Sequence, residues 1–115
     1  MAVNKPIDHP TPEQFVHPGG WDQEFPPLSL PAMFLQSASA DPGAPLVDFM
    51  GRRFSYADLA AQARAFAAGL QTKGCKKGHR IGLFLPNVPI YVSAYYGIMM
   101  AGAIAVNFSP LYTVE

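Results

Sequence analysis

The chain has 115 residues, half of them apolar, and its eight basic residues balance eight acidic ones. This length suits one domain or part of one, and zero net charge argues against a basic surface for nucleic acid or anionic lipid. The single Cys75 excludes an internal disulfide and is typical of a reducing compartment, while His9, His17 and His79 are too scattered to complete a zinc site. No signal-peptide core is present and glycines interrupt the most apolar stretch, so we expect a cytoplasmic protein without a transmembrane segment.

The first part of the chain holds most of the prolines, which predicts that residues 1–27 form an extended arm. Trp21 and Phe25 are predicted to anchor this arm to the body or to a neighbouring copy, because large aromatic side chains are costly to leave in water. Ser29 is then a good N-cap for a short helix that has a proline in its first turn and runs to about Ser39.

A hairpin and a longer helix are predicted next. Leu46–Met50 and Arg52–Phe54 are two short strand-like runs joined around Gly51, a residue that readily takes positive φ. Ser55 and Asp58 resemble a capping box with Asp in place of Glu. The apolar positions that follow have the helical period and predict one buried face: Leu59, Ala63, Phe66, Ala67 and Leu70.

The last third of the chain predicts a strand-helix-strand unit. Arg80–Leu85 is a continuous apolar run, typical of a strand covered on both faces. Asn87 is predicted to cap a mostly buried helix, and Ala103–Asn107 predicts a second strand, parallel to the first through a right-handed crossover. The predicted fold class is therefore α/β: a partial N-terminal domain with a short β-hairpin, helices and a parallel strand-helix-strand unit.

The end of the sequence predicts a continuation. Thr113 is a good helix N-cap, and Glu115 would lie in the first turn, where a carboxylate offsets the positive end of the helix dipole. We therefore expect residues 28–115 to be the first part of a larger domain. Strands 81–85 and 103–106 would then keep apolar faces exposed, which predicts a homo-oligomer formed by docking or by exchange of the arm.

Two sequence features are candidate ligand sites. Gly97 and Gly102 have the outer spacing of a phosphate loop, but no Lys-Ser/Thr pair follows, so we interpret them as close-packing and helix-end residues. The segment Lys73–Arg80 gathers four cations and a histidine. It could hold a phosphate, or it could offset the negative end of a helix and keep a loop solvated. Cys75 lies among these cations without a partner for a catalytic triad.

The remaining candidates are aromatic or acidic. Tyr91, Tyr95 and Tyr96 could present hydroxyls to a ligand, but their spacing on one helix is more typical of core residues with hydrogen-bonded tips. Asp22 and Glu24 flank nothing that resembles a substrate pocket. Since no nucleophile elbow, metal cluster or dinucleotide fingerprint is present either, we assign no catalytic, cofactor-binding or metal-binding residue.

Three stretches of the sequence, taken in order, match known motifs. Arg53–Leu59 followed by Ala67–Leu70 resembles TYxEL…ANxL, Lys76–Asn87 is similar to GVxKGDRVxxxLPN, and Ala101–Thr113 is similar to AGxxxVxxNPLYT. Together they resemble the acyl-adenylate-forming, AMP-binding enzyme superfamily. The Asn-x-x-Pro-Leu-Tyr-Thr ending resembles long-chain fatty acid CoA ligases. The chain departs from the usual pattern at three positions: Cys75 for Val or Leu, His79 for Asp and Ser109 for Asn.

The resemblance implies a two-step reaction in the full enzyme: a fatty acid, ATP and Mg²⁺ give an acyl-adenylate and pyrophosphate, and CoA then displaces AMP. The family's phosphate loop with its Lys, its acidic Mg²⁺ residue, its ribose-binding Asp and its C-terminal-domain Lys have no counterpart in residues 1–115. The chain alone is therefore expected to be inactive scaffold. Alternatives are an aryl- or medium-chain acyl-CoA ligase, or a stand-alone module that binds a partner through its arm and sheet edge; peripheral membrane association of the full protein also stays open.

Overall fold

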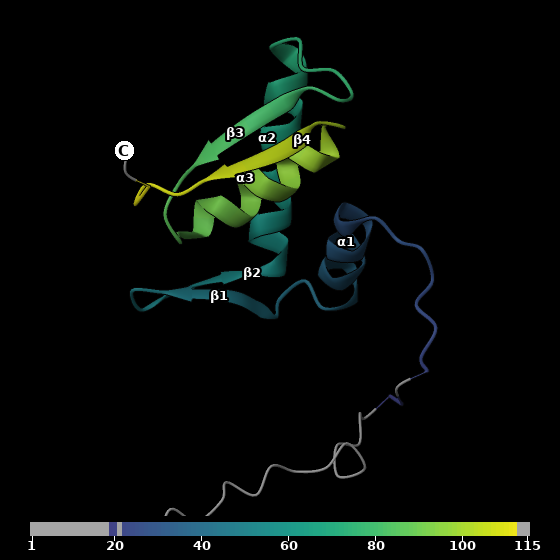
Figure 1. Cartoon of the computed structure of the whole chain (residues 1–115). Coiled ribbons are helices and arrows are strands. Elements are labelled where there is room, and N and C mark those ends of the chain that lie inside the picture. Colours follow the sequence, from purple (N-terminus) through teal and green to yellow (C-terminus); the bar gives the residue numbers. More distant parts are fainter. Residues whose placement is uncertain (1–18, 21, 113–115) are drawn as a thin grey trace, which may run out of the picture.

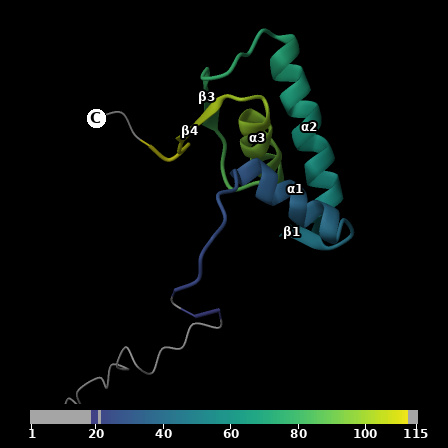
Figure 2. The same cartoon turned by 90° about the vertical axis from the view of Figure 1, so that its right-hand side faces the viewer.

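The computed structural model describes residues 19, 20 and 22–112. Its elements follow in the order α1 (Leu30–Ala40), β1 (Pro45–Phe49), β2 (Arg52–Ser55), α2 (Tyr56–Thr72), β3 (Arg80–Phe84), α3 (Pro89–Met100) and β4 (Ile104–Phe108) (Figure 1). β1 and β2 form one two-stranded sheet, and β3 and β4 form another. In the side view α3 lies between the β3–β4 sheet and α2 (Figure 2). This layering of helices and strands confirms the predicted α/β class.

The first helix begins where the sequence predicts. The Ser29 hydroxyl accepts a hydrogen bond from the backbone N–H of Ala32 at 3.3 Å, and Pro31 lies in the first turn, where a missing N–H costs the helix nothing. Phe34 and Ala38 are one turn apart and are buried together with residues of α2. The helix is therefore held to the body by this narrow apolar stripe.

The hairpin turn contains a feature that the sequence did not indicate. Met50 and Gly51 both have positive φ, 50° and 77°, which is the pattern of the type I′ turn that suits the twist of a two-residue hairpin. Gly51 takes this conformation without strain, whereas a side chain such as that of Met50 costs about 1 kcal/mol there. The strands pair antiparallel, and Arg53 Nε lies 3.3 Å from Asp48 Oδ2 across them.

The predicted capping box is present at the start of α2. Ser55 Oγ accepts from the Asp58 N–H and Asp58 Oδ2 accepts from the Ser55 N–H, both at 3.1 Å. These reciprocal bonds satisfy two backbone donors that the first turn leaves without partners. The pKa of the Asp58 carboxyl is lowered below its ordinary value of 3.8. The hydrogen bond with the Ser55 backbone is the larger cause, and the interaction with the Ser55 side chain is the second.

The contact between α2 and α3 forms the centre of the molecule. At Gly97 a Cβ atom would lie 2.8 Å from the Ala63 carbonyl oxygen and 2.9 Å from Phe66 Cβ, so only glycine permits this approach. Ser93 is fully buried beside it, and its hydroxyl donates to Gln62 Oε1 at 2.9 Å. The interpretation of Gly97 as a close-packing residue is confirmed.

The predicted strand-helix-strand unit is also confirmed. β3 and β4 pair in parallel, with Arg80 opposite Ile104 and Phe84 opposite Phe108. β3 ends one residue before the predicted Leu85, and β4 is shifted by one residue from the predicted 103–107. Most residues of α3 are buried or half-buried, as expected for a helix that packs on both a sheet and another helix.

The start of α3 corrects one prediction. Asn87 does not cap the helix: the N-cap is Val88, which makes no side-chain cap hydrogen bond, and Pro89 opens the helix. A proline favours an extended conformation for the residue before it. Val88 has this conformation, with φ −128° and ψ 157°. Since Pro89 has no N–H and its φ already suits a helix, it fixes the start one residue later than a capping Asn would.

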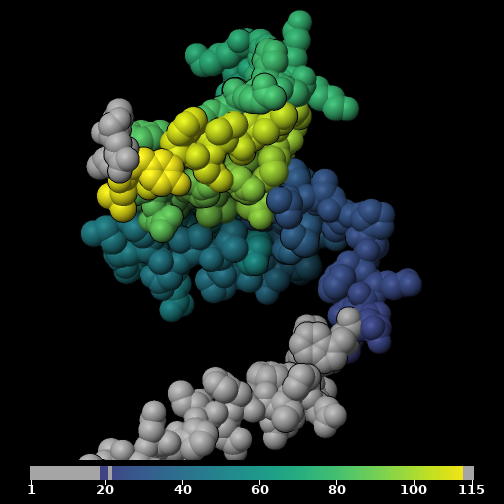
Figure 3. Space-filling model, in the orientation of Figure 1, coloured from purple at the N-terminus to yellow at the C-terminus, as the bar shows by residue number. Residues whose placement is uncertain are grey.

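The two faces of the β3–β4 sheet are covered to different extents. Leu83 and Ala103 are buried against α3, whereas Phe84, Ile104 and Phe108 on the opposite side are 66%, 48% and 49% exposed. We call these three residues the outer sheet face. In the space-filling view β4, in yellow, lies open on the front of the molecule (Figure 3). The apolar exposure expected for these strands is therefore present on one face.

The described part of the arm corrects a second prediction. Residues 22–27 are all exposed and lead away from the body (Figure 1). Phe25 is 77% exposed, so the prediction that it packs against the body is wrong, while Trp21 lies outside the described residues. Pro26 and Pro27 hold this segment extended and offer no backbone donors with which to dock. Packing on a second copy stays a prediction.

Within the described residues, no helix is both long and apolar enough to cross a membrane.

Candidate functional site

One hollow lies at the carboxyl ends of β3 and β4, the edge at which parallel strands commonly present ligand sites. Its volume is about 390 Å³, and it is lined by residues 85–87, Tyr91 and residues 107–112. It forms because both strands run in one direction, so the segment that leaves β3 and the segment that leaves β4 flank the first turns of α3. We call it the carboxyl-end pocket.

A short hydrogen bond connects two walls of this pocket. The Tyr91 hydroxyl on α3 donates to Asn107 Oδ1 on β4 at 2.6 Å. Tyr91 also stacks on Tyr95, with ring centroids 5.9 Å apart, and both rings are half-buried. The geometry at Tyr91 therefore matches the interpretation of a packed ring with a hydrogen-bonded tip.

The aromatic row continues from the pocket toward α1. Tyr95 meets the edge of Tyr96 at 5.7 Å, and Tyr96 stacks on Phe34 at 4.2 Å. Removal of the Tyr96 hydroxyl from water raises its pKa above the ordinary value of 10.0, and the neighbouring Tyr95 and Tyr56 add to this effect. The row joins α3 to α1 and is mainly structural.

The chemistry of the carboxyl-end pocket follows from its lining. None of the described side chains that line it is charged, and their polar groups are amides and hydroxyls. A triphosphate needs cations or a metal ion to neutralise it, and the described residues contain no group of three His, Cys, Asp or Glu that could hold a metal. The pocket therefore fits an uncharged or apolar group, and the residues present do not fit ATP with Mg²⁺.

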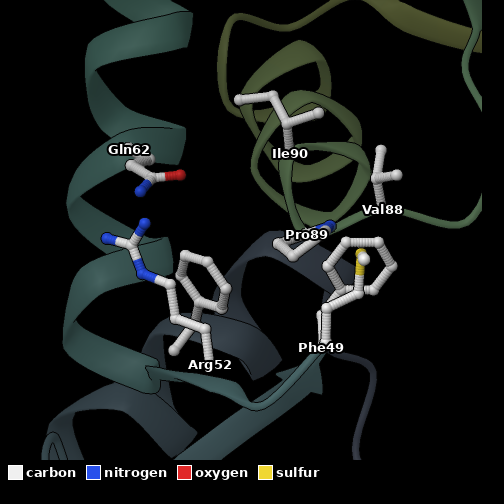
Figure 4. A pocket seen from close by; sticks show the side chains of 8 residues that line it. Phe49, Arg52, Gln62, Val88, Pro89 and Ile90 are labelled. Carbon is white, nitrogen blue, oxygen red and sulfur yellow. The ribbon is translucent and has the colours of Figure 1, made fainter.

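A second hollow is an apolar groove of about 440 Å³ between the hairpin and the start of α3 (Figure 4). Arg52 and Gln62 lie on one side of it, and Phe49 and Val88 lie on the other (Figure 4). Among the described residues that line the groove, Arg52 is the one that is charged, and its Cζ lies 5.0 Å from the Phe54 ring centroid. The groove offers one cation and apolar walls, but no nucleophile and no acid–base pair.

The structure separates the residues that the sequence singled out. Gly102, with φ 81°, follows the end of α3 and forms no phosphate loop with Gly97. Cys75 is half-buried in the loop before β3. Asp22 and Glu24 are exposed in the arm and line neither hollow. Of the candidates among the described residues, Tyr91 lines the carboxyl-end pocket and Tyr96 lines a further hollow between α1 and α3. His9 and His17 are outside the described residues.

Sequence reasoning missed Asn107 and Arg52 as lining residues. Asn107 carried a usable signal, because an amide near the carboxyl end of an otherwise apolar strand requires a polar partner. Its partner Tyr91 is 16 residues away, and that pairing depends on the register of α3 on the sheet. Arg52 carried no such signal, since exposed cations on hairpins are common.

Comparison with known proteins identifies the family. A family model described as AMP-binding enzyme matches residues 34–115, and the chain belongs to this family. It is 38% identical over 103 residues to a protein named "Long-chain-fatty-acid--CoA ligase" from Bacillus subtilis (strain 168), which covers 81% of this chain and 18% of that protein. It is 44% identical over 86 residues to the protein of the same name from Escherichia coli O6:H1, covering 74% and 15%. The family resemblance seen in the sequence is confirmed.

A solved structure shows the same fold. The N-terminal subdomain of Klebsiella oxytoca NpsA, in complex with 3-hydroxyanthranilyl-AMSN, matches with a TM-score of 0.70 at 25% identity, over 73% of this chain and 22% of that one. The chain spans only 15–18% of the length of the two curated relatives above. It therefore holds a small part of the structure on which those relatives are built.

Proposed function

We propose that the protein to which this chain belongs is a long-chain fatty acid CoA ligase. A carboxylate oxygen of the fatty acid attacks the α-phosphate of ATP, and pyrophosphate leaves as the acyl-adenylate forms. The CoA thiolate then attacks the acyl carbon, and AMP leaves as the thioester forms. Mg²⁺ is the ion proposed to neutralise the phosphates during the first step.

The observation that supports this proposal is the pair of identities to long-chain-fatty-acid CoA ligases, 38% and 44% over most of the chain. The matched region includes the Lys76–Asn87 and Ala101–Thr113 motifs. The family model spans residues 34–115, which include the strand-helix-strand unit and the residues that line the two hollows.

The role proposed for this chain is structural. Residues 28–115 would form the first part of a large N-terminal domain, and residues 1–27 would form an arm on its surface. No residue of the chain is assigned to catalysis, to a cofactor or to a metal. The hydrogen bond between Tyr91 and Asn107 fixes the carboxyl-end edge of β4, the edge at which further ligand-binding segments of an α/β domain would be positioned.

The chain alone is expected to bind no ATP, because neither hollow combines the cations and metal ligands that a triphosphate requires. Titration calorimetry with Mg-ATP measures this directly, and the expected result is the heat of dilution only. Saturable binding at micromolar ATP would show that a nucleotide site exists among these residues, and it would contradict the scaffold role without contradicting the family.

The activity itself is tested on the product of the complete reading frame from which the chain comes. We expect acyl-CoA formation that depends on ATP and CoA and is faster with a long-chain fatty acid than with a medium-chain one or benzoate. A preference for benzoate would favour the aryl-CoA ligase alternative, for which the aryl ligand of the NpsA subdomain is the supporting observation. A reading frame that ends at Glu115 would favour the stand-alone interaction module.

The setting proposed for the protein follows from the same observations. We propose that it is cytoplasmic, takes fatty acid rather than nucleic acid as its partner, and self-associates through the outer sheet face. Large exposed apolar side chains on adjacent strands are the physical reason for the last point, since soluble monomers rarely leave such patches uncovered.

A further inference from the structure

The charges of the chain cancel in total but are segregated along it. Between Leu59 and Tyr112 there is no Asp or Glu, and every ionised side chain in that stretch, histidine aside, is a cation: Arg64, Lys73, Lys76, Lys77 and Arg80. The zero net charge that argues against an anionic partner therefore hides a basic half of the chain. A local field of this kind can attract an anionic surface even when the whole molecule is neutral.

Four of these cations lie in residues 73–80, which comprise the connection between α2 and β3 and the first residue of β3. We call this segment the basic loop. This loop lies at the end of α2 that is distant from the hairpin and the arm (Figures 1 and 2), and it protrudes in the space-filling view (Figure 3). Every residue of the loop except Cys75 is exposed. The carboxylates of the described residues lie in the arm, before β1, in the hairpin and in the first turn of α2: Asp22, Glu24, Asp41, Asp48 and Asp58.

The cations of the basic loop are not neutralised within the described structure. The one ion pair among the described residues joins Arg53 to Asp48 in the hairpin, away from the loop. Lys73 follows the last turn of α2 and can offset the negative end of that helix. Lys76, Lys77 and Arg80 lie beyond that turn, so stabilisation of the helix does not account for them.

The basic loop is held in place by hydrogen bonds. The Gly78 N–H donates to the Gly102 carbonyl at 2.9 Å, and the Ile104 N–H donates to the His79 carbonyl at 2.8 Å, which ties the loop to the start of β4. Within the loop, the Lys76 N–H donates to His79 Nδ1 at 3.2 Å. The cations are thus presented on a fixed backbone, which lowers the entropy lost when a partner binds.

The shape and composition of the basic loop favour a broad anionic surface over a small ligand or a nucleic acid. Its residues line neither hollow, and it contains no Phe, Tyr or Trp on which a base could stack. Ile104, which pairs with Arg80, is 48% exposed beside it, and a mixture of cations and apolar side chains suits a lipid interface. We propose that the basic loop docks the protein on an anionic phospholipid surface. The proposal rests on the proposed function in one respect: long-chain fatty acids partition into bilayers, where such docking would bring the enzyme to its substrate.

The experiment is sedimentation of the chain with vesicles of phosphatidylcholine, with and without about a third of phosphatidylglycerol. We compare the chain with the double variant Lys76→Gln/Lys77→Gln and with Arg53→Gln/Arg64→Gln, which removes the same charge at exposed positions outside the loop. We expect the chain to prefer anionic vesicles, the loop variant to lose roughly tenfold or more in affinity, and the control to lose much less. Salt should weaken binding of the chain to anionic vesicles.

Three results would overturn the proposal. Equal binding to neutral and anionic vesicles would point to apolar adsorption through the outer sheet face. An equal loss in the two variants would show an effect of net charge without a role for the loop. Binding of a single-stranded oligonucleotide that depends on the loop, with no binding to vesicles, would indicate a nucleic-acid partner. The assay contains no ATP, CoA or fatty acid, so failure of the proposed ligase activity is detected separately by the acyl-CoA assay.

Discussion

Gly97 sets the distance between α2 and α3, because any Cβ at this position would meet backbone and side-chain atoms of α2 at less than 3 Å. We expect Gly97→Ala to destabilise the fold by about 1–3 kcal/mol, since the two helices must separate to accept the extra methyl group. Urea unfolding followed by circular dichroism measures the change. A variant as stable as the parent chain would mean that the helices are not in close contact in solution.

Gly69 provides the matched control for this substitution. It lies inside α2, and a Cβ added there would have no neighbouring atom within 4 Å, so Gly69→Ala adds the same methyl group to open space. Alanine favours a helix over glycine by up to about 1 kcal/mol, and this variant should be more stable than the parent. Changes of the same sign at both positions would contradict the assignment of Gly97 to the helix–helix contact.

Tyr96 makes a prediction about alkaline pH. Its pKa is raised in the folded state, chiefly by desolvation, so its contribution to stability is complete below the unfolded value of 10.0 and is lost as the pH rises through the folded value. Thermal melts from about pH 9 upward should show a smaller loss of stability for Tyr96→Phe than for the parent chain. The exposed Tyr112→Phe serves as control and should follow the parent; a parallel decline of all three proteins would contradict the prediction.

At the scale of the elements, the capping box makes the start of α2 sensitive to both sequence and pH. Ser55→Ala removes one acceptor from the first turn and should cost about 1 kcal/mol. The Asp58 pKa is lowered in the folded state, so its contribution is present above the unfolded value and is lost as the pH falls through the folded value. The difference in stability between the chain and Asp58→Ala should therefore shrink as the pH drops below about 4.

Ser29 distinguishes the capping box from a simple cap. Its hydroxyl also accepts from a helix N–H, but no acidic residue lies in the first turn of α1. Ser29→Ala should therefore lower stability by a similar amount, about 1 kcal/mol, with a pH dependence that matches the parent chain. If the stability difference between Ser29→Ala and the parent chain shrank at low pH as it does for Asp58→Ala, the effect at Asp58 would not come from its hydrogen bonds to Ser55.

Local signals made most of the elements predictable. Ser29, Gly51 and the Ser55–Asp58 pair each act within a few residues, and the structure shows the helix cap, the turn and the capping box that they indicate. The prediction that Asn87 caps α3 was wrong because two local rules competed there: Asn favours the N-cap position, and Pro favours the first helical position. The fixed φ of Pro89 decided where the helix starts. The prediction that Phe25 packs against the body was wrong because it considered only the cost of exposing the ring. It left out the two prolines that follow and keep the segment extended.

The site was less predictable than the elements. The bond between Tyr91 and Asn107 joins residues on different elements, and it follows from the placement of α3 on the sheet, which no short pattern specifies. The family motifs identified the fold and the proposed activity but marked no residue of either hollow as functional. The positive φ of Met50 was also hidden, because the turn type depends on the twist of both strands.

For the whole molecule, the outer sheet face predicts self-association. Sedimentation velocity over a hundredfold range of concentration should show a shift from monomer toward a larger species, because Phe84, Ile104 and Phe108 are large apolar side chains exposed on one face of the sheet. Phe84→Asn should weaken this association, while Leu28→Asn, which alters an exposed residue before α1, should leave it intact. A monomer at all concentrations would show that the described residues need no partner.

The β3–α3–β4 unit also bears on how the chain acquires its structure. Its two strands are separated in sequence by one helix and its short connections, so closing this pair costs less chain entropy than pairing strands from distant segments. α3 covers one face of the pair, and Gly97 allows α2 to pack closely against α3. We expect this unit to be the folding nucleus of the region, so that substitutions at Ile98 or Leu83 slow refolding while changes in the hairpin mainly speed unfolding.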